Sequence, residues 1–299
     1  MKSYQSMIVG FDFTPCSTAA LGQALRLAAG FKAELRAVHV IDTLVAIELE
    51  EALSELQQNV RDGLLADARR AWEESSATIP GSAAVPFDVT INSRLVGIVA
   101  KAREYQADLL VLGAFGETAA DVGVGTVATA CVRSAPSDVL LVRDTQRDPF
   151  KLVVAAVDFS EHSARALERA AQLAQKDGAA LHVLHVFEAP WHRLHYRAPT
   201  TQQAPHFVRQ YRDGIERRLE EFARATLQSI TAPEPQCHVL DQGGHRSGIV
   251  AYAQEQGADL IALGTRGRAN LHDVLLGTTA EKTLQLSTCS VLAVRPATA

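Results

Sequence analysis

The chain contains the same pattern twice, and this internal repeat limits the folds open to it more than any other feature. Four segments of the first half recur in the second. Residues 9–14 match 155–160, and 38–40 match 184–186, both at an offset of 146 residues. Residues 107–113 match 258–264 at an offset of 151, and 138–143 match 290–295 at an offset of 152. An offset that grows slowly indicates two copies with small insertions. Because 299 residues accommodate two domains of ordinary size, we expect one domain over 1–146 and a second over 150–299.

Apolar runs alternate with segments of helical periodicity in the same order in both halves. The pattern predicts a helix that begins after Thr14, with Pro15 in its first turn, and a long helix across 47–76. Each domain is therefore expected to be α/β, with an open five-stranded, mainly parallel sheet and helices on both faces. The expected strands lie at 7–12, 33–41, 87–91, 108–112 and 138–142, and at 151–157, 180–187, 236–241, 259–263 and 290–295; the other helices of the first half are expected at 95–106 and 126–134.

Composition and charge exclude several classes of protein. Hydrophobic residues make up 47% and charged residues 21%, as in an ordinary globular chain, and no apolar stretch reaches the roughly 18 residues of a membrane helix. Residues 1–148 carry a net charge of −6 and residues 149–299 a net charge of +1, so we expect no nucleic-acid partner. The four cysteines show no metal or disulfide spacing, which favours inert thiols in the reducing cytoplasm.

Glycines cluster in the second half where a strand is expected to end and a helix to begin. The sequence GTRG at 264–267 follows the apolar run 258–263, and Gly277 precedes Thr278, which we expect to cap a helix together with Glu281. Open α/β sheets bind ligands at the carboxyl ends of their strands. Glycine allows the backbone to approach a phosphate closely, and a helix N-terminus favours an anion. The pattern therefore predicts a phosphate site.

The spacing G-x2-G-x9-G-[ST] resembles the nucleotide-binding signature of the ATP-binding universal stress proteins. Asp158 at the end of a first strand and the closing strand 290–295 share this resemblance, which is to the tandem form of the family and covers nearly the whole chain. It implies ATP as the ligand, with ADP or AMP as alternatives and Mg²⁺ as a candidate companion. Asp158 would bind the nucleoside end and the backbone of Val186 the adenine, while Arg266 and Arg268 would grip phosphate oxygens. The expected nucleotide-binding set is Val157, Asp158, Val186, Leu263, Gly264, Arg266, Gly267, Arg268, Gly277, Thr278 and Thr279.

Each of these residues also has a purely structural interpretation. Gly264 and Gly267 can form a tight turn, Thr278 can cap a helix, Asp158 can help start one, and Arg268 can be a solvated loop residue. These explanations account for the residues singly and leave their joint spacing unexplained. The ligand site is therefore the favoured hypothesis.

The first copy departs from the glycine pattern. Gly113 and Gly116 are retained, but only eight residues then precede Gly125. Phe115 and Glu117 stand where the second copy has its two arginines, with Asp121 further along the loop. Carboxylates facing a triphosphate repel it, so we expect a degenerate first site with structural or partner-facing duties. Weaker binding of a nucleotide or of another ligand stays open.

An irregular segment at 189–207 follows the second strand of the second half and is rich in histidine and aromatic residues. It is expected to form a lid, with Trp191 or Tyr196 over the adenine and Arg193 or Arg197 near the phosphates. His192 and His195 form only an isolated H-x2-H, too few ligands for a zinc site, so no metal is expected. His182 and His185 lie three residues apart on a strand and should face opposite sides.

No pattern of a dedicated catalyst is present. The sequence contains neither G-x4-G-K-[ST] nor G-x-S-x-G, so we assign no catalytic residue. Three functions remain: an ATP-binding stress-response or regulatory protein with an unidentified protein partner, a slow ATPase or phosphotransferase, and a structural partner-binding protein with a vestigial pocket. The resemblance also implies that the strands at 138–142 and 290–295 pair within one chain as a pseudo-dimer, with a homodimer left open.

Overall fold

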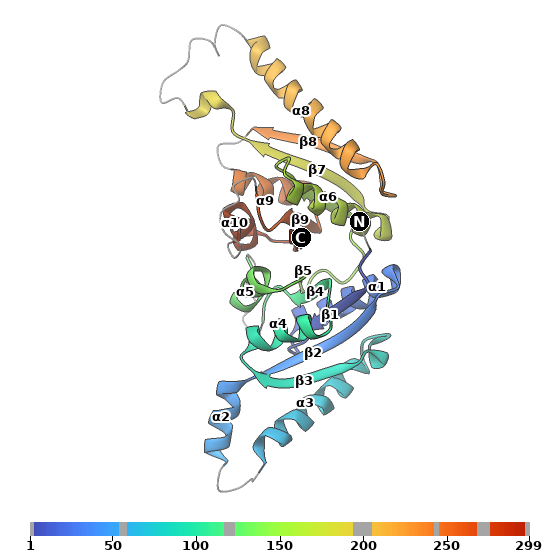
Figure 1. The fold of residues 1–299 in the computed structure, drawn as a ribbon, viewed down its shortest axis with the longest axis vertical. Coiled ribbons are helices and arrows are strands. Elements are labelled where there is room, and N and C mark those ends of the chain that lie inside the picture. Colours follow the sequence, from blue (N-terminus) through green and yellow to red (C-terminus); the bar gives the residue numbers. More distant parts are fainter. Residues whose placement is uncertain are drawn as a thin grey trace. The chain divides into compact units, whose positions relative to one another are not determined.

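The computed structural model describes residues 3–53, 59–116, 123–193, 205–241, 245–267 and 276–296, with side chains left out at 192, 193, 205, 245 and 246. The chain divides into two units, Lys2–Asp148 and Pro149–Ala299. Each unit is an α/β domain built on a parallel sheet, as the alternating pattern predicts (Figure 1).

The first unit begins with a strand and alternates strands with helices. Its sheet has the order β3-β2-β1-β4-β5, and every neighbouring pair is parallel. Parallel strands place all their carboxyl ends on one edge, where the connecting loops gather. The elements are β1 (Ser6–Gly10), α1 (Pro15–Phe31), β2 (Glu34–Asp42), α2 (Thr43–Ala52), α3 (Val60–Ser76), η1 (Ser82–Ala84), β3 (Phe87–Asn92), α4 (Arg94–Glu104), β4 (Leu109–Gly113), α5 (Thr126–Ser134) and β5 (Asp138–Val142).

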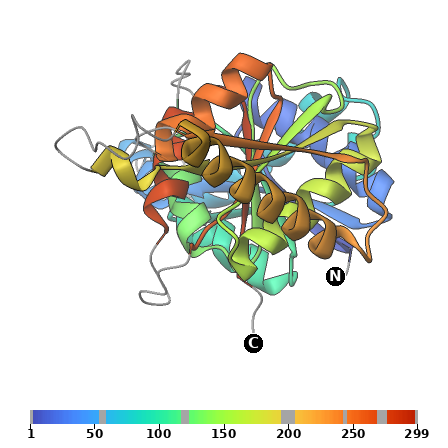
Figure 2. The same ribbon diagram turned by 90° about the horizontal axis from the view of Figure 1, so that it is seen from above.

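The second unit repeats this topology with the order β8-β7-β6-β9-β10, again parallel throughout. Helix α6 packs against α8 and helix α9 against α10, and Figure 2 shows α8 crossing the strands of this unit. The elements are β6 (Leu152–Ala156), α6 (Glu161–Asp177), β7 (Ala180–Phe187), η2 (Pro190–Arg193), α8 (Pro205–Leu227), β8 (Pro235–Asp241), α9 (His245–Gln256), β9 (Leu260–Gly264), α10 (Thr278–Leu286) and β10 (Ser290–Val294).

Local sequence signals explain where several elements begin and end. Thr14 caps α1 by accepting a hydrogen bond from the backbone N–H of Ser17 at 3.3 Å, and Pro15 occupies the first helical position, as predicted. Ser160 caps α6 in the same way, and Gly178 ends that helix at φ 64°, a left-handed conformation suited to glycine.

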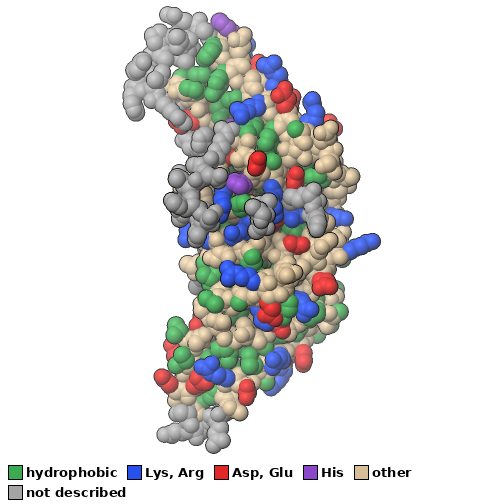
Figure 3. Space-filling view, in the orientation of Figure 1, with side chains coloured by type: hydrophobic (Ala, Val, Ile, Leu, Met, Phe, Trp, Pro, Cys, Tyr) green, Lys and Arg blue, Asp and Glu red, His purple; other side chains and the backbone are tan. Residues whose placement is uncertain are grey.

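Burial follows the strand pattern, and the exposed large apolar side chains among the described residues lie on α2, α4 and α8: Leu44, Val45, Ile47, Val96 and Phe207. Strands β5 and β10 are buried at every position, which matches the near-continuous apolar runs of a parallel sheet. Lys and Arg are interspersed with Asp and Glu on the face shown in Figure 3. Cys16 and Cys131 are buried, and none of the four cysteines forms a disulfide; burial raises the pKa of Cys131 to about 12.

The single helix expected across 47–76 is wrong. Helix α2 starts earlier, at Thr43, where Asp42 caps it, and it ends at Ala52. Asn59, directly before α3, has φ −136° and ψ 63°, which lies outside the helical region. Apolar side chains at helical spacing predicted the single helix, but Leu49 lies in α2, Val60 and Leu64 lie in α3, and Leu56 lies outside the described residues.

Candidate functional site

The loop after β9 returns to the start of α10, so two glycine segments that are separate in sequence meet. The backbone N–H of Gly277 donates to the carbonyl oxygen of Thr265 at 2.8 Å. A Cβ atom added to Gly277 would lie 3.3 Å from that oxygen and 3.8 Å from the backbone nitrogen of Gly267. A side chain at Gly277 would therefore cover the loop backbone, which glycine leaves approachable.

Asp158 faces this loop from the end of β6. A Cβ atom added to Gly267 would lie 3.1 Å from Asp158 Oδ2. The other carboxylate oxygen, Oδ1, accepts hydrogen bonds from the backbone N–H of Ser160 at 3.1 Å and from its hydroxyl at 2.5 Å. One oxygen thus belongs to the turn that opens α6, and the other points to the loop. The structure brings Asp158, Gly267 and Gly277 together.

Helix α10 begins at Thr278, with Gly277 as its N-cap and no side-chain capping hydrogen bond. The predicted capping box of Thr278 with Glu281 is therefore wrong. Gly277 already has the extended backbone that precedes a helix, φ −60° and ψ 139°, and its hydrogen bond to Thr265 fixes it there. Backbone N–H groups in a first turn without a side-chain cap, at the positive end of the helix dipole, suit an anion.

The remaining predicted site residues divide by burial. Val157, Leu263 and Val186 are buried, so only their backbone groups can meet a ligand. Thr279 is half-buried and Thr278 is exposed. Arg266 is also half-buried, whereas Arg268 lies outside the described residues, and its phosphate contact stays a prediction.

The first unit repeats the backbone arrangement. The N–H of Gly125 donates to the carbonyl of Ala114 at 2.7 Å, as that of Gly277 does in the second unit. A Cβ atom added to Gly116 would lie 3.6 Å from Asp12 Oδ2. Asp12 Oδ1 accepts from the backbone N–H of Thr14 at 3.2 Å and from its hydroxyl at 2.6 Å. The two units therefore share the scaffold and differ in the side chains placed on it.

The clearest difference is at Phe115, which stands where the second unit has Arg266. The Phe115 ring is buried, and the guanidinium carbon of Arg143 lies 4.8 Å from its centroid. Arg143 is itself buried and donates to the carbonyl of Gly123 at 3.2 Å. Glu117 and Asp121, the expected sources of repulsion, lie outside the described residues.

Sequence reasoning missed the residue that follows each aspartate. Phe159 has φ 64° and Phe13 has φ 66°, a left-handed conformation that is rare for a bulky side chain. Each ring lies against a histidine of the next strand: Phe159 is 4.3 Å from His185 and Phe13 is 5.0 Å from His39 between centroids. The recurrence of Asp-Phe and of Val-His-Val or Leu-His-Val at the same offset was the available signal.

Each of these histidines also binds the end of the first strand. His185 Nδ1 lies 2.8 Å from the carbonyl oxygen of Val157, and His39 Nδ1 lies 2.7 Å from that of Phe11. Burial lowers the pKa of His39, so the neutral ring is favoured there. The histidine thus links the strand that carries the aspartate to its neighbour in both units.

A second histidine cluster lies on the opposite face of β7, as the spacing of His182 and His185 predicts. The Tyr252 hydroxyl is 2.9 Å from His182 Nδ1, and the His182 and His238 rings are 4.7 Å apart. Burial lowers the pKa of both histidines and raises that of Tyr252 to about 12. Within the described residues no group of three or more His, Cys, Asp or Glu side chains could hold a metal ion.

The lid expected at 189–207 lies largely outside the described residues. Its two described ends meet, because the Trp191 ring contacts Phe207 at 6.1 Å and Tyr211 at 5.3 Å. Tyr196, His195 and Arg197 fall in the part that is not described, as do the side chains of His192 and Arg193.

No helix in the described parts of the chain is long and apolar enough to cross a membrane.

The repeated parallel sheets and their glycine-lined loops define a tandem α/β protein of the Rossmann-like class. A family model described as the universal stress protein family matches residues 3–143 and again 149–295. The chain therefore belongs to the universal stress protein family, in a tandem form with two copies of the domain.

Single-domain relatives match about half of the chain. Universal stress protein YxiE of Bacillus subtilis is 29% identical over 147 residues, which is 49% of this chain and 99% of that protein. The Thermus aquaticus universal stress protein encoded in the QAH/OAS sulfhydrylase 3' region is 33% identical over 148 residues, 49% of this chain and 99% of that protein. A universal stress protein structure from Archaeoglobus fulgidus covers 97% of this chain and 98% of its own, with a TM-score of 0.61 and 19% identity, and so shows a shared fold.

Proposed function

We propose that the second domain binds an adenine nucleotide, with ATP as the preferred ligand, and that the protein is a nucleotide-responsive regulator in the stress response. The observation that carries this proposal is the convergence of Asp158 Oδ2 with the backbone at Gly267 and Gly277, beside the first turn of α10. Polyphosphates bind where backbone N–H groups are approachable, and an acidic residue suits the hydroxyls of a ribose.

Different residues of the site are proposed to bind different parts of the nucleotide. The loop 264–267 and the N–H groups of Thr278 and Thr279 hold the phosphates, with Arg266 and Arg268 supplying positive charge. Asp158 accepts from the ribose, and the backbone of Val186 meets the adenine. Mg²⁺ enters bound to the phosphates of ATP.

For the first domain we propose weaker nucleotide binding or none. Its backbone offers the same approach at Gly116 and Gly125, but buried Phe115 replaces an arginine that would meet the phosphates. The role of this domain is then structural or directed to a protein partner. The internal pairing of the two closing strands stays a prediction.

The test is the nucleotide content and affinity of the purified protein. Heat denaturation followed by chromatography of the supernatant should release about one adenine nucleotide per chain, and titration calorimetry with ATP, ADP and AMP, with and without Mg²⁺, should rank the three. The absence of both bound nucleotide and binding heat contradicts the proposal and favours a partner-binding protein with a vestigial pocket. Phosphate release above background that Asp158→Ala abolishes favours a slow ATPase.

A further inference from the structure

The turn at Phe159 fixes the position of the Asp158 carboxylate. A bulky residue in the left-handed region is strained, and such a conformation persists where its surroundings hold it. At Phe159, φ is 64°, and the chain turns so that Ser160 donates two hydrogen bonds to Asp158 Oδ1. With Oδ1 held in this way, Oδ2 is left facing Gly267.

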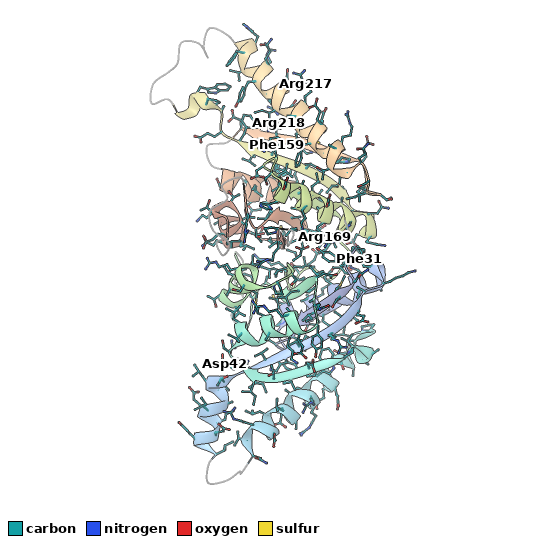
Figure 4. All side chains as sticks on the ribbon, viewed as in Figure 1. Phe31, Asp42, Phe159, Arg169, Arg217 and Arg218 are labelled. Atoms are coloured by element: carbon teal, nitrogen blue, oxygen red, sulfur yellow. The ribbon has the colours of Figure 1, made fainter. Side chains whose placement is uncertain are left out.

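Side chains from two further elements hold the Phe159 ring. His185 of β7 lies 4.3 Å from it, and Phe222 of α8 meets it edge-on at 5.5 Å between centroids. The guanidinium carbon of Arg218, also on α8, lies 4.3 Å from the ring centroid (Figure 4). Arg218 and Phe222 are four residues apart and therefore share one face of the helix. Helix α8 thus clamps the residue that follows Asp158.

The described residues of the first domain place no helix cation or helix aromatic ring against the corresponding ring, Phe13. Phe13 has the same backbone conformation, but its ring contacts are Phe11 of the adjoining strand end at 5.0 Å and His39 of β2 at 5.0 Å. The helix that corresponds to α8 is α3, and its Trp72 contacts Phe11 instead, at 5.2 Å. Within the described ranges, a helix cation over this ring is therefore found in the second domain and not in the first.

We infer that Arg218 is a positioning residue for the nucleoside end of the ligand. Its guanidinium lies over the Phe159 ring and holds the turn that orients the Asp158 carboxylate. Nucleotide affinity therefore depends on how α8 packs against this turn. This inference rests on the proposed nucleotide site. Arg218 is exposed, and a cation over an aromatic ring at an exposed site has a modest effect, which corresponds to an affinity change of about two- to fivefold. Since Asp158 is assigned to the nucleoside end, the effect should fall on that end of the ligand.

The test compares ATP with inorganic tripolyphosphate by titration calorimetry. Arg218→Met keeps the alkyl stem and removes the charge, so ATP affinity should fall about two- to fivefold while tripolyphosphate affinity is unchanged. Arg218→Lys should restore most of the ATP affinity. The matched control is Arg217→Met: Arg217 is also exposed and lies on the same helix, and the variant should bind ATP like the wild type (Figure 4).

The outcomes separate this inference from the proposed function. If the wild-type protein binds no adenine nucleotide, both the proposed function and this inference are refuted. Wild-type binding of ATP with an unchanged affinity in Arg218→Met overturns the inference alone, and an equal loss of tripolyphosphate affinity shows instead that the arginine contacts phosphates. A second pair of variants tests the ring: Phe159→Gly, which tolerates the positive φ, should weaken ATP binding, whereas Phe13→Gly should leave it unchanged.

Discussion

Replacing Gly277 with valine should remove ATP binding by obstructing the phosphate loop. The new Cβ would stand 3.3 Å from the Thr265 carbonyl and 3.8 Å from the Gly267 nitrogen, and its methyl groups would extend over the loop backbone. Loss of one or two charge-assisted hydrogen bonds costs about 3 kcal/mol, or roughly a hundredfold in affinity. At an ATP concentration of about 100 times the wild-type Kd, the ligand's contribution to the free energy of unfolding would fall from about 2.7 to about 0.4 kcal/mol.

The assay is the thermal midpoint with and without ATP. A stabilisation of about 2.7 kcal/mol raises the midpoint of a domain of this size by about 5–10 °C, and the variant should retain about 1 °C of that shift. Gly125→Val is the matched control, since its Cβ would stand 3.5 Å from the equivalent carbonyl of Ala114 in the first domain. Equal losses in the two variants, or a full ATP shift in Gly277→Val, refute the assignment of the site to the second domain.

Three further predictions address the aspartate, the buried histidines and two helical glycines. Asp158→Asn should weaken ATP binding by about tenfold or more and spare tripolyphosphate, because it removes the charged acceptor for the nucleoside, as calorimetry can show. Burial lowers the pKa of His182 and of His238 in the folded chain, and the buried Nε2 of His238 has no hydrogen-bond partner among the described residues. As pH falls below about 6.5, the unfolded chain therefore binds protons at these histidines before the folded chain does. Stability should therefore drop in that window, and His238→Phe should flatten the drop in urea denaturation at stepped pH. Gly97→Ala should lower the free energy of unfolding by about 1–3 kcal/mol, because the new Cβ would lie 2.8 Å from a valine of β2. Gly22→Ala in α1 should raise it by about 0.5–1 kcal/mol, because no atom lies within 4 Å of the new Cβ. Denaturant titration measures both changes.

The sequence by itself determined the repeat, the class of each domain and the strand positions to within two residues. Strands β5 and β7 and helix α5 begin and end where the pattern predicts, because apolar runs and helical periodicity are local properties of the chain. The capping of α1 by Thr14 before Pro15 is equally local. The errors were also local: apolar residues at helical spacing continue from Leu49 to Leu64, past the end of α2 at Ala52, and Gly277 takes the cap position expected for Thr278.

Only the tertiary structure decided which residues meet. Asp158 and Gly267 are more than 100 residues apart, and they meet because β6 and β9 are neighbours in a parallel sheet whose loops gather at one edge. Phenylalanine disfavours the left-handed turn at Phe159, so the residue type alone does not predict it; the same turn recurs at Phe13, and both rings contact a histidine of the neighbouring strand. Periodicity places a residue on a face of its own element, whereas the neighbours of that face depend on how the crossovers order the strands.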